Sequence, residues 1–295
     1  MIKLKDLLLE NDAPNIFIPR RLDDRPVRYN QMTQKEVNSI IDYYNDDQDK
    51  DSLDLSGSDP DDDDDEDEFS RSKLSLSGDF KIPDTLKKVK GGLYLSNTGV
   101  TKLPDNLTIG EYEYSHLDVS YCKKLNALPK GLKVVSVNGS YSSLIEIPDD
   151  IQTTELELKY TKVKQLPLFK NFIKNIDLEG CKSLKTLPEG FTAGELTIEY
   201  SPIVSIPNNV KLKQLVVREC KNFTSIGSNC SIDILSIGYG CLNFTTLPTD
   251  IKANQVSIVF NSQFKINLLN KFETDKKILN ALQKMYPNVQ QFMID

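Results

Sequence analysis

Pairs of apolar residues that flank a single residue recur ten times along this chain, and most are followed by a polar stretch and then by Leu-Pro or Ile-Pro. We call the first residue of each pair the opening residue. The opening residues are Leu74, Leu93, Leu117, Val135, Leu156, Ile176, Leu196, Leu215, Leu235 and Val256, at intervals of 18 to 24 residues. A period near twenty residues predicts a solenoid in which each repeat contributes one strand.

The repeat over residues 176–195 shows how such a unit would fold. Ile176 and Leu178 alternate with Asp177 and Glu179, so the apolar side chains point to one side of a strand and the acidic ones to the other. Pro188 fixes φ and has no amide donor, which favours an extended return path over a helix. About twenty residues leave room for one strand and its turns. We therefore expect an outer side that is extended or contains single helical turns.

Stacking of neighbouring repeats removes the recurring apolar residues from water, because no single repeat can bury them alone. Each fully buried apolar side chain contributes roughly 1.5–3 kcal/mol to the free energy of unfolding. The strands then lie in parallel about 4.8 Å apart. The pattern thus predicts one continuous interior shared by all repeats.

The outer half of several repeats reads Leu-Pro-x-x-Leu or a close variant, as in residues 103–107, 128–132 and 147–151. This pattern resembles the short form of the leucine-rich repeat, over about residues 74–260. The resemblance implies a horseshoe with a parallel concave β-sheet, an extended or single-turn convex side and helical caps at both ends. In that family the fifth residue after the opening residue is usually Asn or a small substitute that ties adjacent turns together. One repeat departs from the pattern, because Ile226-Gly227 replaces the apolar-Pro pair and predicts a local kink.

Open stacks need caps that cover their terminal apolar sides. Thr33 and Glu36 form a capping box, which predicts a helix that carries Val37, Ile40, Ile41 and Tyr44 on one face. Near the other end, Thr274 is expected to cap a helix that carries Ile278, Leu282 and Met285 and ends at Pro287. We therefore divide the chain into an N-terminal segment with a capping helix (residues 1–45), an acidic segment (46–73), the solenoid (74–260) and a C-terminal cap (261–295).

The net charge of −7 is unevenly distributed along the 295 residues. Residues 46–68 contain fourteen acidic residues and one lysine, so the rest of the chain carries +6. The uninterrupted run from Asp61 to Glu68 favours a disordered stretch, because like charges at this density repel one another. A docking tail for a basic partner is the second interpretation. Leu53-Asp-Leu55 also imitates an opening pair, so the acidic run could instead lie in an outer loop of a degenerate first repeat.

The segment over residues 1–30 combines a Met-Ile-Lys-Leu-Lys start with four arginines and two aspartates between positions 19 and 29. In this respect the chain resembles leucine-rich-repeat proteins that tailed bacteriophages encode. The short Leu-Pro repeats also resemble, more distantly, the repeat regions of secreted bacterial effectors. No secretory signal and no apolar run of about eighteen residues are found. We therefore expect a soluble protein, without membrane contact, in a host cytoplasm or a virion.

Catalytic and metal-binding chemistry find little support in the sequence. Cys122, Cys181 and Cys220 are each the fifth residue after an opening residue, and Cys230 falls on an outer apolar position. Only Cys241 lies outside a recurring position. The five cysteines are odd in number and form no C-x-x-C pair, which favours buried, reduced thiols. His116 is the single histidine, and no zinc spacing or glycine-rich phosphate loop is found. We expect no catalytic residue, no metal, no cofactor and no enzyme activity.

The concave face is the candidate for function. The residues that would line it are Asp118, Glu157, Asp177, Glu179 and Glu199, against the bases Lys159 and Arg218. This excess of acids disfavours nucleic acid, whose binding requires clustered Lys and Arg. The fourth residue after the opening residue is tyrosine in alternate repeats, at Tyr121, Tyr160, Tyr200 and Tyr239, with Gly139, Gly180 and Glu219 between them. Steric exclusion between neighbouring rings explains this alternation as well as a binding ridge does, although tyrosine is common at binding hot spots.

The sequence therefore predicts a non-enzymatic scaffold that binds a protein partner through its concave face and through the edge that carries Tyr121, Tyr160, Tyr200 and Tyr239, which we call the tyrosine edge. Two alternatives remain: a secreted bacterial effector made of repeats without a ligase domain, and a structural or decoration protein of a virion. The sequence does not identify the partner or the oligomeric state.

Overall fold

The computed structural model of the chain describes residues 33–46, 51–56, 78–110, 113–258, 263–272 and 274–294. These fall into two compact units. The N-terminal unit comprises residues 1–144 and 150–154, and the C-terminal unit comprises residues 145–149 and 155–295. The run from Asp61 to Glu68, the segment 1–30 and the predicted opening residue Leu74 lie outside the described residues.

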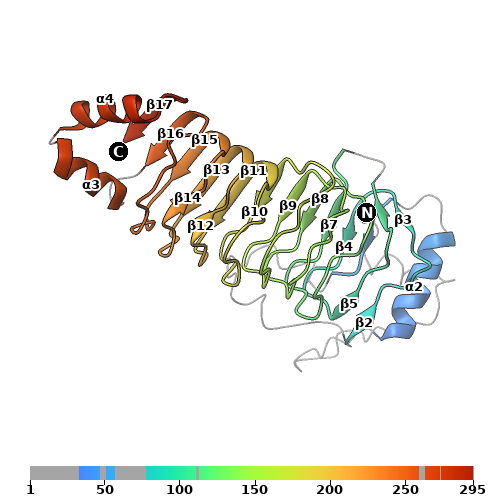
Figure 1. The fold of residues 1–295 in the computed structure, drawn as a ribbon. Helices are drawn as coiled ribbons and strands as arrows, with labels where there is room; N and C mark the ends of the chain where they lie inside the picture. The colour runs from blue at the N-terminus through green and yellow to red at the C-terminus, as the bar shows by residue number, and fades with distance from the viewer. Residues whose placement is uncertain are drawn as a thin grey trace, which may run out of the picture. The chain divides into compact units, whose positions relative to one another are not determined.

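Helix α2 begins the described part of the N-terminal unit, and eight short strands follow it (Figure 1). The elements are α2 (Gln34–Asp46), β1 (Leu53–Asp54), β2 (Phe80–Lys81), β3 (Lys88–Val89), β4 (Leu93–Tyr94), β5 (Val100–Lys102), β6 (Thr108–Ile109), β7 (His116–Asp118) and β8 (Ser136–Asn138). Strands β1, β4, β7 and β8 pair in that order, all in parallel. The pairs β2–β5 and β3–β6 form separate two-stranded sheets, so the return path is extended, as predicted.

The first described strand agrees with the interpretation that Leu53 opens a degenerate first repeat, and it differs from the prediction that Leu74 opens the first repeat. Strand β4 pairs directly with β1, with Leu93 opposite Leu53. The repeat pattern predicted that Leu74 opens the neighbouring strand. The return path that pairs with β5 begins at Phe80, opposite Val100. The strand of Leu53 and the return path of Phe80 thus take the places that one repeat would fill.

The register of the fourth predicted strand is also corrected. Leu117 pairs with Val137 and not with Val135. Val137 is buried whereas Val135 is half-exposed, and Gly139 takes the place of the second apolar residue. The sequence misled because Val135-Ser-Val137 imitates an opening pair. With Val137 as the opening residue, the intervals around it become 20 and 19 residues, close to the common period.

The described part of the C-terminal unit contains nine strands and two helices. They are β9 (Glu155–Glu157), β10 (Asn175–Asp177), β11 (Thr192–Glu199), β12 (Ser205–Ile206), β13 (Lys211–Arg218), β14 (Ser225–Ile226), β15 (Ser231–Ile237), β16 (Ala253–Ile258), α3 (Gln263–Phe272), α4 (Asp275–Met285) and β17 (Val289–Ile294). Strands β9, β10, β11, β13, β15, β16 and β17 form a parallel sheet in that order, and β12 pairs with β14. Figure 1 shows these strands stacked side by side.

The interior of the C-terminal unit is the predicted one. Leu156, Ile176 and Leu196 lie opposite one another on successive strands and are at most 2% exposed. Leu158, Leu178 and Ile198 form the next buried column. A third column follows the return path, where the rings of Phe223 and Phe244 stack with centroids 5.5 Å apart. The parallel stacked coils confirm the predicted repeat solenoid.

The predicted caps are present in both units. In the N-terminal unit, the backbone N–H of Thr33 donates to Glu36 Oε2 (2.6 Å), and the helix buries the four predicted side chains. Gln34 then exchanges two hydrogen bonds with the backbone of Lys81 in β2. In the C-terminal unit, the backbone N–H of Lys277 donates to Thr274 Oγ1 (3.4 Å).

Two details of the C-terminal cap were not predicted. Ile278 and Leu282 are buried, but Met285 is 42% exposed and Tyr286 is the buried residue at the end of the helix. The phenol of Tyr286 donates to the carbonyl of Leu247 (3.2 Å). After Pro287 the chain adds strand β17 to the sheet beside β16.

The outer turns explain why Asn and Gly follow the Leu-Pro motif. Asn106, Gly131, Gly190, Asn209 and Asn229 all have φ between 55° and 73°, which Asn and Gly adopt most readily. These turns are tied to one another, as where the amide of Asn229 donates to Asn209 Oδ1 (2.7 Å).

At the irregular repeat, Gly227 supplies an amide that proline would lack. Its N–H donates to the carbonyl of Ile206 (2.8 Å). A Cβ at this position would lie 2.6 Å from the backbone of Pro207. The glycine is therefore explained by close approach to the preceding repeat.

Candidate protein-binding face

The charged residues that the sequence analysis assigned to the sheet face of the C-terminal unit lie on the side of the sheet opposite the buried columns. Glu157 ends β9, Asp177 ends β10 and Glu199 ends β11. Because side chains alternate along a strand, these residues point away from the interior that Leu156, Ile176 and Ile198 fill. The strands thus bring carboxylates from consecutive repeats to one solvent-facing surface, which we call the acidic face. Its members are Glu157, Lys159, Asp177, Glu179, Glu199 and Arg218.

Lys159 lies at the centre of this face. Its Nζ is 3.3 Å from Glu157 Oε1, 3.5 Å from Asp177 Oδ2 and 3.9 Å from Glu179 Oε2. Three carboxylates surround one ammonium, so the cluster keeps a net charge of about −2. The side chain of Lys159 is 31% exposed, and the three partners are 27–45% exposed. Because these side chains are accessible to solvent, a cationic group from outside can replace Lys159 as the ion-pair partner of the carboxylates.

The charges of the cluster affect the titration of Lys159. Partial burial lowers the pKa of its ammonium, but the carboxylates of Asp177 and Glu157 outweigh burial and raise that pKa above its ordinary value. Lys159 therefore stays charged at neutral pH. Its single positive charge offsets only part of the negative charge of the three surrounding carboxylates.

Two more predicted residues make contacts at the end of the strands. Arg218 Nη1 lies 3.1 Å from Glu199 Oε1, joining β13 to β11. The phenol of Tyr160 donates to Glu179 Oε1 (2.9 Å), which links the tyrosine edge to the acidic face. Surface ion pairs of this kind add little to the free energy of unfolding. Their significance lies in the charge that they present.

The tyrosine edge of the C-terminal unit is exposed. Tyr160, Tyr200 and Tyr239 are 38%, 52% and 65% exposed. Tyr160 and Tyr200 have φ of 55° and 50°, because the chain turns sharply at the end of each strand. A Cβ on Gly180 would lie 2.4 Å from the ring of Tyr160. The ring of one repeat therefore covers the glycine of the next, which supports the steric explanation at this position.

The N-terminal unit contradicts a strict alternation. Once the register is corrected, Tyr141, and not Gly139, is the fourth residue after the opening residue. Tyr141 stacks on Tyr121 with ring centroids 4.8 Å apart and an angle of 5° between the planes. Neighbouring repeats can thus both hold a ring. The predicted spacing of two strands between tyrosines is wrong here.

Asp118 has a structural contact of its own in the N-terminal unit. Its Oδ1 accepts the backbone N–H of Ser120 (2.9 Å), a local bond that shapes the end of β7. His116 Nδ1 lies 2.8 Å from Ser136 Oγ on the next strand. Both side chains are half-exposed on the sheet face.

Tyr239 and Cys241 need a further correction. Three residues separate Ile237 from Cys241, whereas two separate Val217 from Cys220, so this repeat has one extra residue. As a consequence Gly240, and not Tyr239, has the positive φ of the turn, at 77°. Cys241 then occupies the same buried position as Cys220. The prediction that Cys241 lies outside the recurring positions is therefore wrong.

The five cysteines are free and buried. In the turn after each strand, the side chain donates to a carbonyl of the preceding repeat, as from Cys122 to Leu95 (3.0 Å) and from Cys181 to Leu158 (3.1 Å). Ser201 makes the equivalent bond to Leu178. Burial raises the pKa of the Cys122 thiol to about 11, which makes it a poor nucleophile at neutral pH. These thiols tie neighbouring repeats together.

Within the described ranges, no group of three or more His, Cys, Asp or Glu side chains is arranged to hold a metal ion. No helix in the same ranges has the length and apolarity required to cross a bilayer.

Sequence reasoning missed three features of the surface. It counted Lys159 among the bases but did not place it among three carboxylates, because that contact joins β9, β10 and the turn after β10. It missed Tyr141, although the uneven intervals of 18 and 21 residues around Val135 signalled a shift of register. It also missed a lysine-lined hollow on the C-terminal unit.

Comparisons with known proteins agree with this architecture. No protein-family model matches the chain, and no solved structure does. The chain is 29% identical over 178 residues to a protein of Arabidopsis thaliana named "Probable disease resistance protein At4g19520", an alignment that covers 52% of this chain and 10% of that protein. It is 27% identical over 166 residues to "Protein SUPPRESSOR OF npr1-1, CONSTITUTIVE 1" of the same plant, covering 53% and 10%.

This chain therefore spans about a tenth of the length of the curated relatives it matches. The similarities and the stacked coils together support a repeat solenoid of the leucine-rich-repeat kind. The resemblance to phage-encoded proteins depends on residues 1–30, outside the described part, and stays a prediction.

Proposed function

We propose that the chain is a non-enzymatic scaffold that binds a protein partner through the acidic face and the tyrosine edge of its C-terminal unit. The observation that carries the proposal is the group of carboxylates around Lys159, which presents excess negative charge from consecutive strands. The printed names of the two relatives, one a probable disease resistance protein and the other a suppressor, are compatible with a protein-interaction role. They specify no partner for this chain.

The chemistry of the face selects a basic segment of the partner. Arg and Lys side chains can pair with Glu157, Asp177 and Glu179, because each carboxylate keeps lone pairs that Lys159 does not use. Complementary charge mainly speeds association and selects among partners. The exposed rings of Tyr200 and Tyr239 add apolar area beside the charges, and tyrosine is enriched at binding hot spots. An extended basic peptide laid across the strands would meet both.

A defined peptide tests the proposal. A fluorescently labelled peptide of about ten residues, rich in Arg and Lys with one or two apolar residues, is titrated with the full chain at low and at physiological salt. We expect saturable binding that weakens as salt rises, because Coulomb attraction at an exposed face is screened. A matched acidic peptide should not bind.

Charge reversal locates the binding surface. The triple variant Asp177→Lys, Glu179→Lys and Glu199→Lys should lose binding of the basic peptide. The control variant Glu146→Lys, Glu189→Lys and Asp250→Lys makes the same change of net charge on the outer turns of the same unit and should retain most of the affinity. Equal loss in the two folded variants would show that overall charge, and not the acidic face, attracts the peptide.

The tyrosine edge is tested separately. The variant Tyr200→Ala and Tyr239→Ala should weaken binding of a basic peptide that carries apolar residues, and should leave binding of a purely basic peptide almost unchanged. Unaltered affinity for both peptides would remove the tyrosines from the proposed surface and leave the acidic face.

A further inference from the structure

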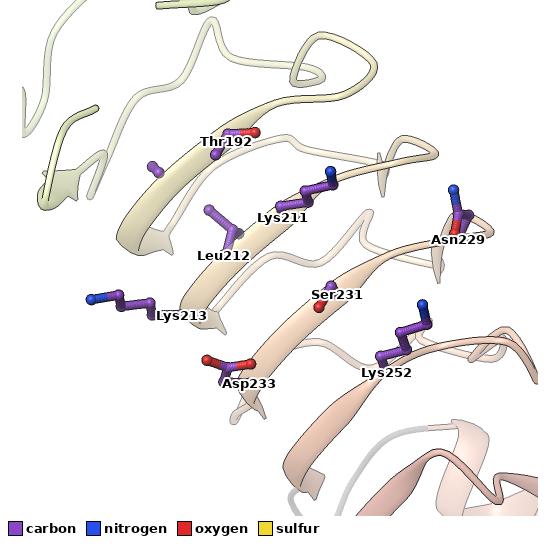
Figure 2. Close-up of a pocket in the computed structure, with 9 residues that line it drawn as sticks. Thr192, Lys211, Leu212, Lys213, Asn229, Ser231, Asp233 and Lys252 are labelled. Atoms are coloured by element: carbon purple, nitrogen blue, oxygen red, sulfur yellow. The ribbon is translucent and has the colours of Figure 1, made fainter. Parts of the chain in front are cut away.

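A hollow of about 370 Å³ lies on the C-terminal unit where strands β11, β13, β15 and β16 begin. We call it the lysine groove. Its polar lining consists mainly of Thr192, Lys211, Lys213, Asn229, Ser231 and Lys252. Figure 2 shows Lys211 and Lys252 extending to the same side of the strands, with Ser231 between them. None of these residues belongs to the acidic face.

The strand register places two lysines around one serine. Lys211 lies opposite Ser231, and Ser231 forms a bridge with Lys252. Neighbouring strands are about 4.8 Å apart, so the two lysine backbones are separated by about 10 Å. The four-carbon stem of lysine is flexible enough to bring both ammonium groups above the serine. A small anion held there would meet a cation from each side and a hydroxyl from below.

The charges of the groove are not satisfied by the protein. Within the described residues, the ammonium groups of Lys211, Lys213 and Lys252 form no ion pair, and the Ser231 hydroxyl forms no hydrogen bond. Asp233 is the acidic residue of the lining, so the groove keeps a net charge of about +2.

The backbone N–H groups and the rim of the groove are already hydrogen-bonded within the protein, so the lysine and serine side chains are the groups left to bind a ligand. The backbone N–H groups of Lys211, Ser231 and Lys252 already donate to Phe191, Val210 and Cys230. At the rim, the amide of Asn229 is held by Asn209 (2.7 Å).

We infer that the lysine groove binds a phosphate group. Lysine ammonium groups are common phosphate ligands, and hydrogen bonds between ionised partners are about twice as strong as neutral ones. A dianion matches the net charge better than a single carboxylate does. A long polyanion fits poorly, because Asp233 lies at one side and Glu195 and Glu199 follow on β11. The ligand is therefore a phosphate monoester or free phosphate and not a nucleic-acid backbone.

Two probes distinguish the sources of the phosphate. The full chain is titrated with inorganic phosphate, and separately with a short phosphoserine peptide and its unphosphorylated copy, at constant ionic strength set with chloride. Amide chemical shifts in NMR spectra measure the binding. We expect saturable shifts at residues 211–213, 231–233 and 252. Binding of both probes indicates a site for free or esterified phosphate, and stronger binding of the phosphopeptide than of its copy and of free phosphate identifies a modified protein as the source.

Substitutions then test the two central lysines. Lys211→Met and Lys252→Met should each weaken phosphate binding about tenfold, the loss of one charged hydrogen bond. Lys252→Arg, which keeps the charge, should retain most of the affinity. The control variant Lys164→Met and Lys182→Met removes two exposed lysines of the same unit outside the groove and should change affinity less than twofold. Circular dichroism and thermal unfolding verify that each variant is folded.

Two results would overturn the inference. One is the absence of saturable binding of either phosphate probe. The other is a loss in the control variant as large as the loss in Lys211→Met or in Lys252→Met, which would show that general positive charge, and not the groove, binds phosphate. Because the groove and the acidic face share no residue, failure here leaves the proposed protein-binding face untouched, and failure of that face leaves the groove intact.

Discussion

The two units build the same interior but present different chemistry on their sheets. In the N-terminal unit, the third residue after the opening residue is serine in each described repeat, at Ser56, Ser96, Ser120 and Ser140. In the C-terminal unit, the same position holds Lys159, Glu179, Glu199, Arg218 and Gly238. The stacking fixes which side chains point inward, and it leaves the outward ones free to differ.

The bonding of the outward side chains differs as well. In the N-terminal unit, Asp54, Asp118 and Asn138 each accept the backbone N–H two residues later, at 2.9–3.0 Å. These side chains are occupied by their own turns. In the C-terminal unit, Asp177 makes the same local bond with the backbone N–H of Glu179 (3.0 Å). The charged side chains of that unit also contact each other across strands, as Lys159 and Arg218 do. The first face has local bonds alone among these three side chains, whereas the second adds accessible charge around Lys159 to a local bond of the same kind.

The largest expected effect tests whether the interiors are equivalent. Leu95 in the N-terminal unit and Leu178 in the C-terminal unit are both fully buried. Changing either to Ala should lower the free energy of unfolding by about 2–5 kcal/mol, through lost burial and the cavity left behind. Urea denaturation followed by circular dichroism measures the change. Leu168→Ala, at a side chain that is 54% exposed, is the control and should stay within about 0.5 kcal/mol of the wild type.

A second prediction concerns the tyrosine edge. Gly180 and Gly190 have similar positive φ, at 67° and 73°, but a Cβ on Gly180 would strike the ring of Tyr160 whereas one on Gly190 would meet nothing within 4 Å. Gly190→Ala should cost about 1–2 kcal/mol, from the left-handed backbone alone. Gly180→Ala should cost about 1–3 kcal/mol more, because the ring must move. Thermal unfolding of both variants measures the difference.

A double-mutant cycle isolates the ring. In a Tyr160→Ala background, Gly180→Ala should cost no more than Gly190→Ala does. If the extra cost persists without the ring, the steric explanation for glycine beside Tyr160 fails. Ring contacts would then not explain why Tyr160 neighbours a glycine whereas Tyr121 neighbours Tyr141.

The sequence predicted the interior well because burial imposes a strict period. Where both residues of an opening pair are large and apolar, as at Leu156 and Leu158, the predicted register is the observed one. Where glycine replaces the second residue of the opening pair, as Gly139 does after Val137, the preceding pair Val135 and Val137 imitates an opening pair. The predicted register is then two residues too early. The period of 2 in a strand makes such a shift invisible to alternation alone.

The surface was predicted in composition but not in contacts. The acids and bases of the sheet could be identified from alternation, because outward positions follow once inward ones are known. The contact of Lys159 with three carboxylates depends on side-chain conformations in two repeats, which no periodicity encodes. The lysine groove was missed for another reason. Its residues precede the opening residues, where the repeat has no recurring apolar signal apart from buried residues such as Leu212.

The third prediction uses the buried thiol of the N-terminal unit. Burial raises the pKa of Cys122 from 9.0 to about 11. Its stabilising contribution is fully present below pH 9, where the thiol is protonated in both states, and is lost between pH 9 and 11, where only the unfolded chain ionises. At pH 10 the loss is about 1.4 kcal/mol. The free energy of unfolding of the wild type should therefore fall more steeply from pH 8 to 10 than that of Cys122→Ser, and parallel curves would contradict the predicted shift.

The smallest effects compare the two faces directly. Asp118→Ala removes the acceptor for the Ser120 amide and should lower the free energy of unfolding by about 0.5–1.5 kcal/mol, whereas Asp118→Asn keeps an acceptor oxygen and should cost less. Glu199→Ala breaks only the exposed pair with Arg218 and should cost about 0–1 kcal/mol, less still in high salt. Urea denaturation at two salt concentrations separates the cases, because the local bond of Asp118 should be nearly insensitive to salt. A larger, salt-independent loss for Glu199→Ala would mean that the charges of the C-terminal unit serve stability, and the argument that they are available to a partner would then lose its basis.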